Sequence, residues 1–328
     1  MPRGRNNARL DPDKILTAAF AVAERDGLSG MTLRMSASTA TASVGSVPAV
    51  SSSRKGIPGL RGTGLIGHLA AVVVVVAAAV AIFGGLLAPD DPDEIDLSGA
   101  FAGSSARHWL GLDSQGRDIV SRLLVGARAS LLGPLLVVAL AITIGAALAI
   151  VSAWRGGFVD SGISAVLDIL FAFPGILLAV LVAAVFGPSL TTAALALGVA
   201  YTPYISRVIR GAALKERSQP YIASLMVQGH SSISICRRHL VPNLAPMIVA
   251  QATLVFGYAM VDLAAISFIG LGVQPPGTDW GLMVSGGQGG MLQGYVAEAF
   301  SAGLCIVIVV VAFNLLGERL ADRNPEQR

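Results

Sequence analysis

Charged and aromatic residues are scarce in this sequence. Asp, Glu, Lys and Arg together make up 13% of the 328 residues and aromatic residues 6%, whereas hydrophobic residues make up 54%. Soluble domains carry about 25% charged residues, so this composition excludes an ordinary soluble protein. The two cysteines, Cys236 and Cys305, are too few for a disulfide framework.

Nucleotide-binding and metal-binding motifs are also missing from the sequence. None of the lysines, Lys14, Lys55 and Lys215, follows a glycine-rich loop of the form G-x-x-x-x-G-K-[ST]. The 4 histidines form no cluster with the spacing of metal ligands. The sequence therefore predicts neither an enzyme nor a chain that binds a cofactor of its own.

Long apolar runs are present instead. Each is about 20 residues long, which is enough to cross the hydrocarbon layer as a helix. These segments are 65–87, 130–153, 163–186, 191–209, 244–271 and 302–320. They predict an all-α integral membrane protein with six transmembrane helices that crosses the cell membrane several times. Pro174 and Pro203 lie inside two of these segments and predict bends or kinks there.

The distribution of Lys and Arg predicts the orientation. Arg54, Lys55 and Arg61 precede the first apolar segment, whereas the loop 272–300 has neither Lys nor Arg. Because cytoplasmic loops are enriched in these residues, both termini and the polar loop 211–242 are predicted to be cytoplasmic.

The polar loop contains a short amphipathic stretch. Ile222, Leu225 and Met226 follow one another at i, i+3 and i+4, so they share one face of a predicted helix. Gly229 supplies a residue that adopts φ > 0 and ends that helix, and Pro242 marks the start of the next apolar segment. A short helix with an exposed apolar face either skims the membrane surface or lies in the groove of a partner.

This loop resembles the cytoplasmic coupling loop of ABC importer permeases, whose pattern begins E-A-A, continues to a glycine and ends at a proline. Ala223 stands where the family has glutamate, and Gly229 and Pro242 keep the register. The resemblance implies docking to a separate ATPase subunit. The residues it assigns to ATPase coupling are Tyr221, Ile222, Ala223, Ser224, Leu225, Met226, Gly229 and Pro242.

The stretch HWLGLDSQGRDIVSR, residues 108–122, resembles the signature of the dipeptide, oligopeptide and nickel permease subfamily, with Leu112 in place of threonine. Further similar motifs are LDILFAFPGIL (167–177), SFIGLGVQPPG (267–277) and AFNLLGERLAD (312–322). The resemblance implies the ABC importer permease fold in the inner membrane and import of peptides, related small solutes or nickel. It also implies three kinds of partner: ATPase subunits that hydrolyse ATP, a sister permease and an extracytoplasmic substrate-binding protein.

Polar residues inside the apolar segments are candidates for the translocation path, because charges there are costly and face a bundle interior or water. The polar candidates are Asp168, Gln251 and Asp262, and Pro174 is a further candidate because a proline inside a helix marks a bend around such a path. The alternatives are an ion pair of Asp168 with Arg207 or Arg210, and helix–helix hydrogen bonds from Gln251 and Asp262.

Outside these segments, His108, Asp113 and Asp118 allow a catalytic reading. The simpler interpretation is a set of turns followed by an i,i+4 pair of Asp118 with Arg122.

The predicted organisation has four parts. Residues 1–63 form a largely disordered cytoplasmic extension, 64–129 the first helix and an extracytoplasmic loop, 130–320 the permease core with its coupling loop 211–242, and 321–328 a cytoplasmic tail. About 25 residues of the extension resemble the first helix of tetracycline-repressor-type regulators, but one helix cannot form a helix-turn-helix.

Other functions compete with the importer. The alternative is an ATP-independent channel or an ion-coupled carrier, followed by a membrane enzyme and a DNA-binding membrane regulator.

Overall fold

The structure is a computed structural model that describes residues 63–322. Within this range the chain is built from helices, with one isolated bridge between Leu112 and Asp118. The helices are α2 (Thr63–Leu87), α3 (Ile119–Arg155), α4 (Gly157–Phe171), α5 (Gly175–Phe186), α6 (Leu190–Arg217), α7 (Pro220–Val227), α8 (Ser232–Ile235), α9 (Val241–Phe268), α10 (Trp280–Met291) and α11 (Ala297–Asp322), with the 3-10 turn η1 (Leu97–Gly99) and the π-helical turn η2 (Cys236–Leu240). The all-α prediction is confirmed. The predicted extension up to residue 62, including its regulator-like helix, and residues 323–328 of the tail lie outside the described residues.

Four of the described helices are long and apolar enough to cross a membrane, and a bent pair makes a fifth. The four are Gly67–Leu87, Ile119–Arg155, Ser232–Phe268 and Ala297–Arg319. The expected fourth span lies in α6, which does not meet the same criterion, because its apolar run gives way to Tyr201, Tyr204 and Arg207. Six crossings therefore remain a prediction.

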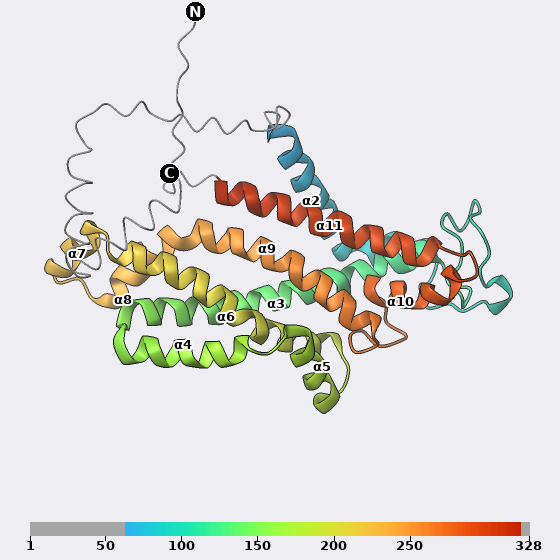
Figure 1. The fold of residues 1–328 in the computed structure, drawn as a ribbon. Helices are drawn as coiled ribbons and strands as arrows, with labels where there is room; N and C mark the ends of the chain where they lie inside the picture. Colours follow the sequence, from blue (N-terminus) through green and yellow to red (C-terminus); the bar gives the residue numbers. More distant parts are fainter. Residues whose placement is uncertain (1–62, 323–328) are drawn as a thin grey trace, which may run out of the picture. The chain divides into compact units, whose positions relative to one another are not determined.

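The expected third span, 163–186, is not one continuous helix. α4 ends at Phe171 and α5 begins at Gly175, and the two helices are bent by 80°. Pro174 stands at the break, where it has no N–H to donate and disfavours helical geometry in the preceding residue. Figure 1 shows α5 turning away from the line of α4. Pro203, by contrast, lies inside the continuous helix α6.

Polar side chains set several helix starts. The carboxylate of Asp118 accepts a hydrogen bond from the backbone N–H of Ser121 (2.7 Å) at the start of α3, and Asp279 accepts one from Leu282 (2.6 Å) at the start of α10. Ser189 does the same for α6 through Thr192 (3.0 Å). Such caps satisfy backbone donors that have no partner within the helix.

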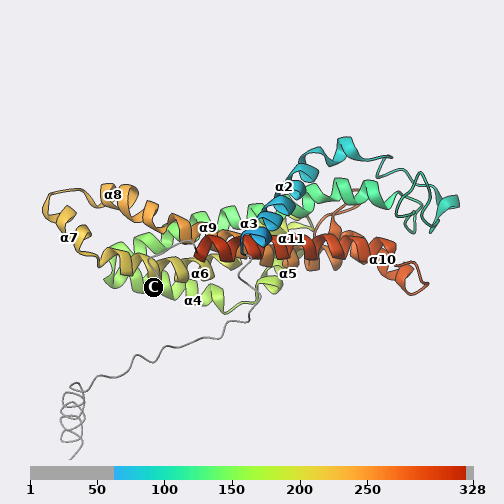
Figure 2. The same ribbon diagram turned by 90° about the horizontal axis from the view of Figure 1, so that it is seen from above.

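The helices pack lengthwise, with α3 against α6, α9 and α2, and α11 against α9 and α2 (Figures 1 and 2). α3 and α6 approach closely because small residues face the partner helix. A Cβ atom added to Gly198 of α6 would lie 2.6 Å from Leu140 Cδ2, and one added to Gly145 of α3 would lie 2.8 Å from Ile205 Cγ2. Within this helical unit, α7 and α8 lie at one end, and α10 and the loop 88–118 lie at the other (Figure 1).

Candidate functional site

The polar loop forms the short helix α7 predicted from its sequence. Pro220 occupies the first turn, where its missing N–H is not needed, and the helix ends at Val227. Gly229 has φ 84°, and the N–H groups of Gly229 and His230 donate to the carbonyls of Met226 and Leu225, both at 3.1 Å. This arrangement satisfies the last carbonyl groups of the helix, so the predicted role of Gly229 is confirmed.

A polar network fixes α7 to the two long helices beside it. The side chain of Asn243, in the first turn of α9, donates to Glu216 of α6 (2.7 Å) and to the hydroxyl of Tyr221 (2.9 Å). The Tyr221 hydroxyl also donates to Glu216. Glu216 and Asn243 were not predicted as site residues, because they lie 27 residues apart and only the fold brings them together. The sequence feature that points to Glu216 is that it is the one acid in the basic loop 211–242.

The exposed face of α7 differs from the predicted one. Ile222 is fully buried within the chain and Leu225 is half-buried. Met226 is exposed, and Val227 is 89% exposed. The expectation that Ile222 faces a partner is therefore wrong: this side chain anchors α7 to its own chain. Ala223, Met226 and Val227, at i, i+3 and i+4, are the residues left for a partner. Ser224 is also exposed, and Pro242 lies in the first turn of α9.

A cavity of about 350 Å³ opens beside the break between α4 and α5. Its walls are aromatic and come from the break, α6 and α9. The lining residues are Phe171, Phe173, Pro174, Gly175, Ala200, Tyr201, Tyr204, Tyr258 and Asp262. Two of the predicted path residues, Pro174 and Asp262, thus line one cavity. The tyrosines were not predicted, although Tyr201 and Tyr204, spaced i, i+3, stand out in a sequence with 5 tyrosines.

Gln251 and Asp262 both lie on α9 and both contact α6. The hydroxyl of Tyr201 donates to Asp262 Oδ2 (2.7 Å), and that of Tyr204 donates to Gln251 Oε1 (3.2 Å). These bonds confirm the helix–helix alternative for both residues. Asp262 also lines the cavity. Gln251 does not line it, but is bonded to Tyr204, which does.

Asp168 pairs with Arg207 rather than Arg210. The guanidinium of Arg207 lies 2.6 Å from Asp168 Oδ1 and stacks over the ring of Phe171, 4.2 Å from the centroid. Arg210 instead binds Asp160 at the start of α4. The structure thus does not place Asp168 in the cavity, but joins it through Arg207 to a ring that lines the cavity.

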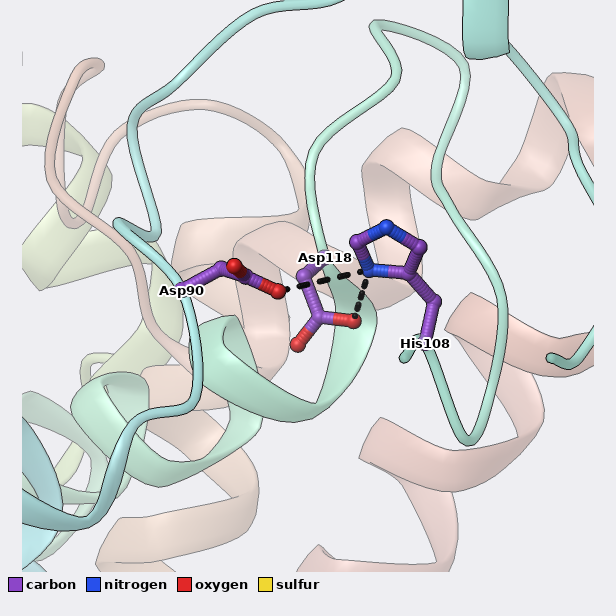
Figure 3. Close-up of side chains that lie close together, drawn as sticks. All are labelled: Asp90, His108 and Asp118. Atoms are coloured by element: carbon purple, nitrogen blue, oxygen red, sulfur yellow. Dashed lines mark hydrogen bonds and ion pairs between the residues drawn. The ribbon is translucent and has the colours of Figure 1, made fainter. Parts of the chain in front are cut away.

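A second group of polar residues lies at the opposite end of the helical unit. His108 Nδ1 lies 3.2 Å from Asp118 Oδ1 and 3.5 Å from Asp90 Oδ2, so the imidazole stands between two carboxylates (Figure 3). Arg107 pairs with the other oxygen of Asp90 (2.8 Å), and this bond raises the pKa of the Arg107 guanidinium. The group ties the loop after α2 to the start of α3.

The structure does not bring His108, Asp113 and Asp118 together into one catalytic site. Asp113 is buried and binds Arg117 (2.8 Å), with the Nε of Arg122 3.7 Å away. The predicted i,i+4 ion pair of Asp118 with Arg122 is also wrong, because Asp118 caps α3 and turns its other oxygen to His108. Asp90 was not predicted as a site residue.

Comparison with known proteins connects these features to one family. The family model described as "Binding-protein-dependent transport system inner membrane component" matches residues 141–324. The chain is 38% identical over 252 residues to the probable D,D-dipeptide transport system permease protein DdpC of Escherichia coli, covering 77% of this chain and 84% of that protein. It is 36% identical over 251 residues to the dipeptide transport system permease protein DppC of Alkalihalophilus pseudofirmus, covering 76% and 82%.

A third relative and one solved structure that are similar to this chain are also transport proteins. The glutathione transport system permease protein GsiD of Escherichia coli is 38% identical over 254 residues, covering 77% of this chain and 84% of that protein. Among solved structures, an inward-facing form of the MetNI methionine ABC transporter matches with a TM-score of 0.50 at 21% identity, over 60% of this chain and 93% of that chain. At this identity the structural match shows a shared fold.

Proposed function

This chain belongs to the family of binding-protein-dependent transport system inner membrane components, and we propose that it forms part of the membrane path of an importer for short peptides. Members of the family are multi-pass permease subunits of the inner membrane. They work with ATPase subunits that hydrolyse ATP, a sister permease and a substrate-binding protein. This membership favours the importer over a channel or ion-coupled carrier that works without ATP.

The short helix α7 carries the mechanistic part of the proposal. It joins two long helices, α6 and α9, and presents Met226 and Val227 to its surroundings while Ile222 and the Glu216 network hold it in place. Apolar side chains on a rigid, protruding helix suit a groove on a partner. We assign this groove to the ATPase. Because Tyr221 near the start of α7 is bonded to Glu216 of α6 and to Asn243 of α9, movement of the ATPase would pass to both long helices.

The substrate class follows from the relatives. The three relatives described above are named as transporters of D,D-dipeptides, dipeptides and glutathione, all of which are short peptides. We assign a peptide of this size to the present chain. We further propose that the chain has no enzymatic activity, binds no cofactor itself and keeps both termini and α7 on the cytoplasmic side.

The experiment replaces one exposed residue of α7. Met226→Asp places a carboxylate in the proposed contact, where burial without a partner costs several kcal/mol, enough to weaken docking about a hundredfold or more. We expect the ATPase to be lost on copurification and the uptake of dialanine to stop, while the permease still enters the membrane.

Met226→Leu is the matched control, because it keeps an apolar side chain of similar size and should retain both properties. Wild-type copurification and uptake by the Met226→Asp chain would show that α7 does not contact the ATPase.

A further inference from the structure

The cavity beside the break between α4 and α5 combines one acidic side chain with several aromatic rings. Among the described residues that line it, Asp262 is the one charged group, and four aromatic rings besides Tyr201 surround it: Phe171, Phe173, Tyr204 and Tyr258. We propose that this cavity binds an ammonium group, and specifically the amino terminus of a peptide in transit. The inference rests on the proposed function and adds which end of the substrate this chain recognises.

The carboxylate of Asp262 has an oxygen available for a ligand. Oδ2 accepts the hydrogen bond from Tyr201 (2.7 Å), and Oδ1 has no hydrogen-bond partner among residues 63–322. A charged hydrogen bond from an ammonium donor to this oxygen would be stronger than a bond between neutral groups. Tyr201 orients the carboxylate, so the acceptor is already in place before a ligand arrives.

Arg207 is not among the residues that line the cavity, because its guanidinium is bound to Asp168 (2.6 Å) and lies over the ring of Phe171. The contact over Phe171 shows that one ring of the cavity wall already contacts a cation.

The aromatic rings suit the same ligand. Tyr258 and Phe173 keep more than half of their surface exposed, at 52% and 58%, so their rings are open to a guest. Cations are attracted to aromatic faces by the ring quadrupole, and more strongly when water is excluded. A volume of about 350 Å³ falls within the range of small-molecule sites. An acid surrounded by aromatic rings thus selects a cationic group over a carboxylate.

The first test measures the charge preference directly. Ala200→Cys places a thiol in the cavity wall, in a chain with Cys236→Ser and Cys305→Ser, assembled in the complete transporter. The probes are three methanethiosulfonate reagents that carry a trimethylammonium group, a sulfonate group or no charge. We expect the ammonium reagent to react at least tenfold faster than the sulfonate reagent, after each rate is divided by that of the neutral reagent, because one nearby carboxylate suffices for such a preference.

Matched variants identify the source of this preference. Asp262→Asn keeps an acceptor for Tyr201 but removes the charge, and should abolish the preference without changing the rate of the neutral reagent. Asp262→Glu should restore it. Tyr201→Phe removes the hydrogen bond but keeps the ring and the carboxylate, and should retain it. Equal preference in Asp262→Asn and the parent chain would overturn the proposal.

The second test measures transport of dialanine in proteoliposomes that contain both permeases, the ATPases and the binding protein. We expect Asp262→Asn to lower the uptake rate about tenfold, and Asp262→Glu to recover most of it. Wild-type uptake by Asp262→Asn would overturn the ammonium site. Failure of the parent transporter to import dialanine would instead count against the proposed function, and the thiol rates would still report on the cavity.

Discussion

At the scale of single residues, His108 shows how one side chain secures a long loop. Its Nδ1 faces Asp118, which is almost fully buried, and Asp90, which comes from a segment 18 residues earlier in the chain. Because Asp118 also caps α3, the imidazole connects the loop to the start of a helix. These polar contacts therefore contribute to the stability of the loop.

His108→Ala should loosen this loop. The change leaves Asp118 Oδ1 buried without its partner, which costs about 1–3 kcal/mol of stability. We expect a lower unfolding temperature in detergent and faster proteolysis of the loop 88–118. His230→Ala, at an exposed position after α7, is the control and should match the parent chain. If the two variants unfold alike, His108 does not hold the loop.

Sequence patterns predicted some of these residues and missed others for a physical reason. Gly229 was predicted correctly, because the need for φ > 0 is local. Asp168 was expected to pair with Arg207 or Arg210, and only the packing of α4 on α6 decides between them. Helical spacing placed Ile222 on an apolar face but could not tell that its own chain already covers that face.

At the scale of elements, α3 and α6 depend on glycine where they meet. The Cβ of any larger residue at Gly198 would lie 2.6 Å from Leu140 Cδ2 and 3.0 Å from Leu140 Cβ. A change of rotamer moves the first atom but not the second, so the helices themselves would have to separate. In a membrane such close packing replaces the hydrophobic effect as the source of helix association.

Gly198→Leu should therefore destabilise the protein. Overpacking of this kind costs about 1–3 kcal/mol, and we expect a lower unfolding temperature with part of the chain aggregated after extraction. Gly162→Leu is the control, because a Cβ at Gly162 of α4 meets open space. An unchanged unfolding temperature for Gly198→Leu would mean that α3 and α6 are not held as closely as described.

The break between α4 and α5 marks the limit of prediction at this scale. Hydropathy predicts one span over 163–186, because Asp168 is its one charged residue. Proline predicts a disturbance at residue 174, but neighbouring helices decide whether the helix continues, as at Pro203, or turns by 80°. The approximate location of the apolar segments could thus be predicted and their division into helices could not, while the number of six crossings stays a prediction.

At the scale of the whole described unit, basic residues lie at both ends. Arg107, Arg117 and Arg122 at the end that carries α10 each face a carboxylate. The α7 end includes Arg237 and Arg238 in the turn η2. The loop 272–300, which contains α10, has neither Lys nor Arg. Because cytoplasmic loops are enriched in these residues, the proposed topology has α7 inside.

Single cysteines test this topology. In a chain with Cys236→Ser and Cys305→Ser, Gln293→Cys after α10 should react with an impermeant maleimide applied to intact cells, and Ser232→Cys in α8 should not. Both positions are exposed in the structure, so access through the membrane decides the result. Permeabilised cells provide the control, in which both should react. Labelling of position 232 from outside intact cells would reverse the orientation.

The bend between α4 and α5 also has a consequence for biogenesis. α4 has 15 residues and α5 has 12, so they reach roughly 22 and 18 Å, short of the hydrocarbon layer of about 30 Å. Neither helix can leave the translocon for lipid as an independent span. α4 packs on α3 and α6, whereas α5 packs mainly on α6, which is synthesised after it. The ribosome must therefore deliver α6 before α5 is stably integrated, so the order of synthesis becomes an order of assembly.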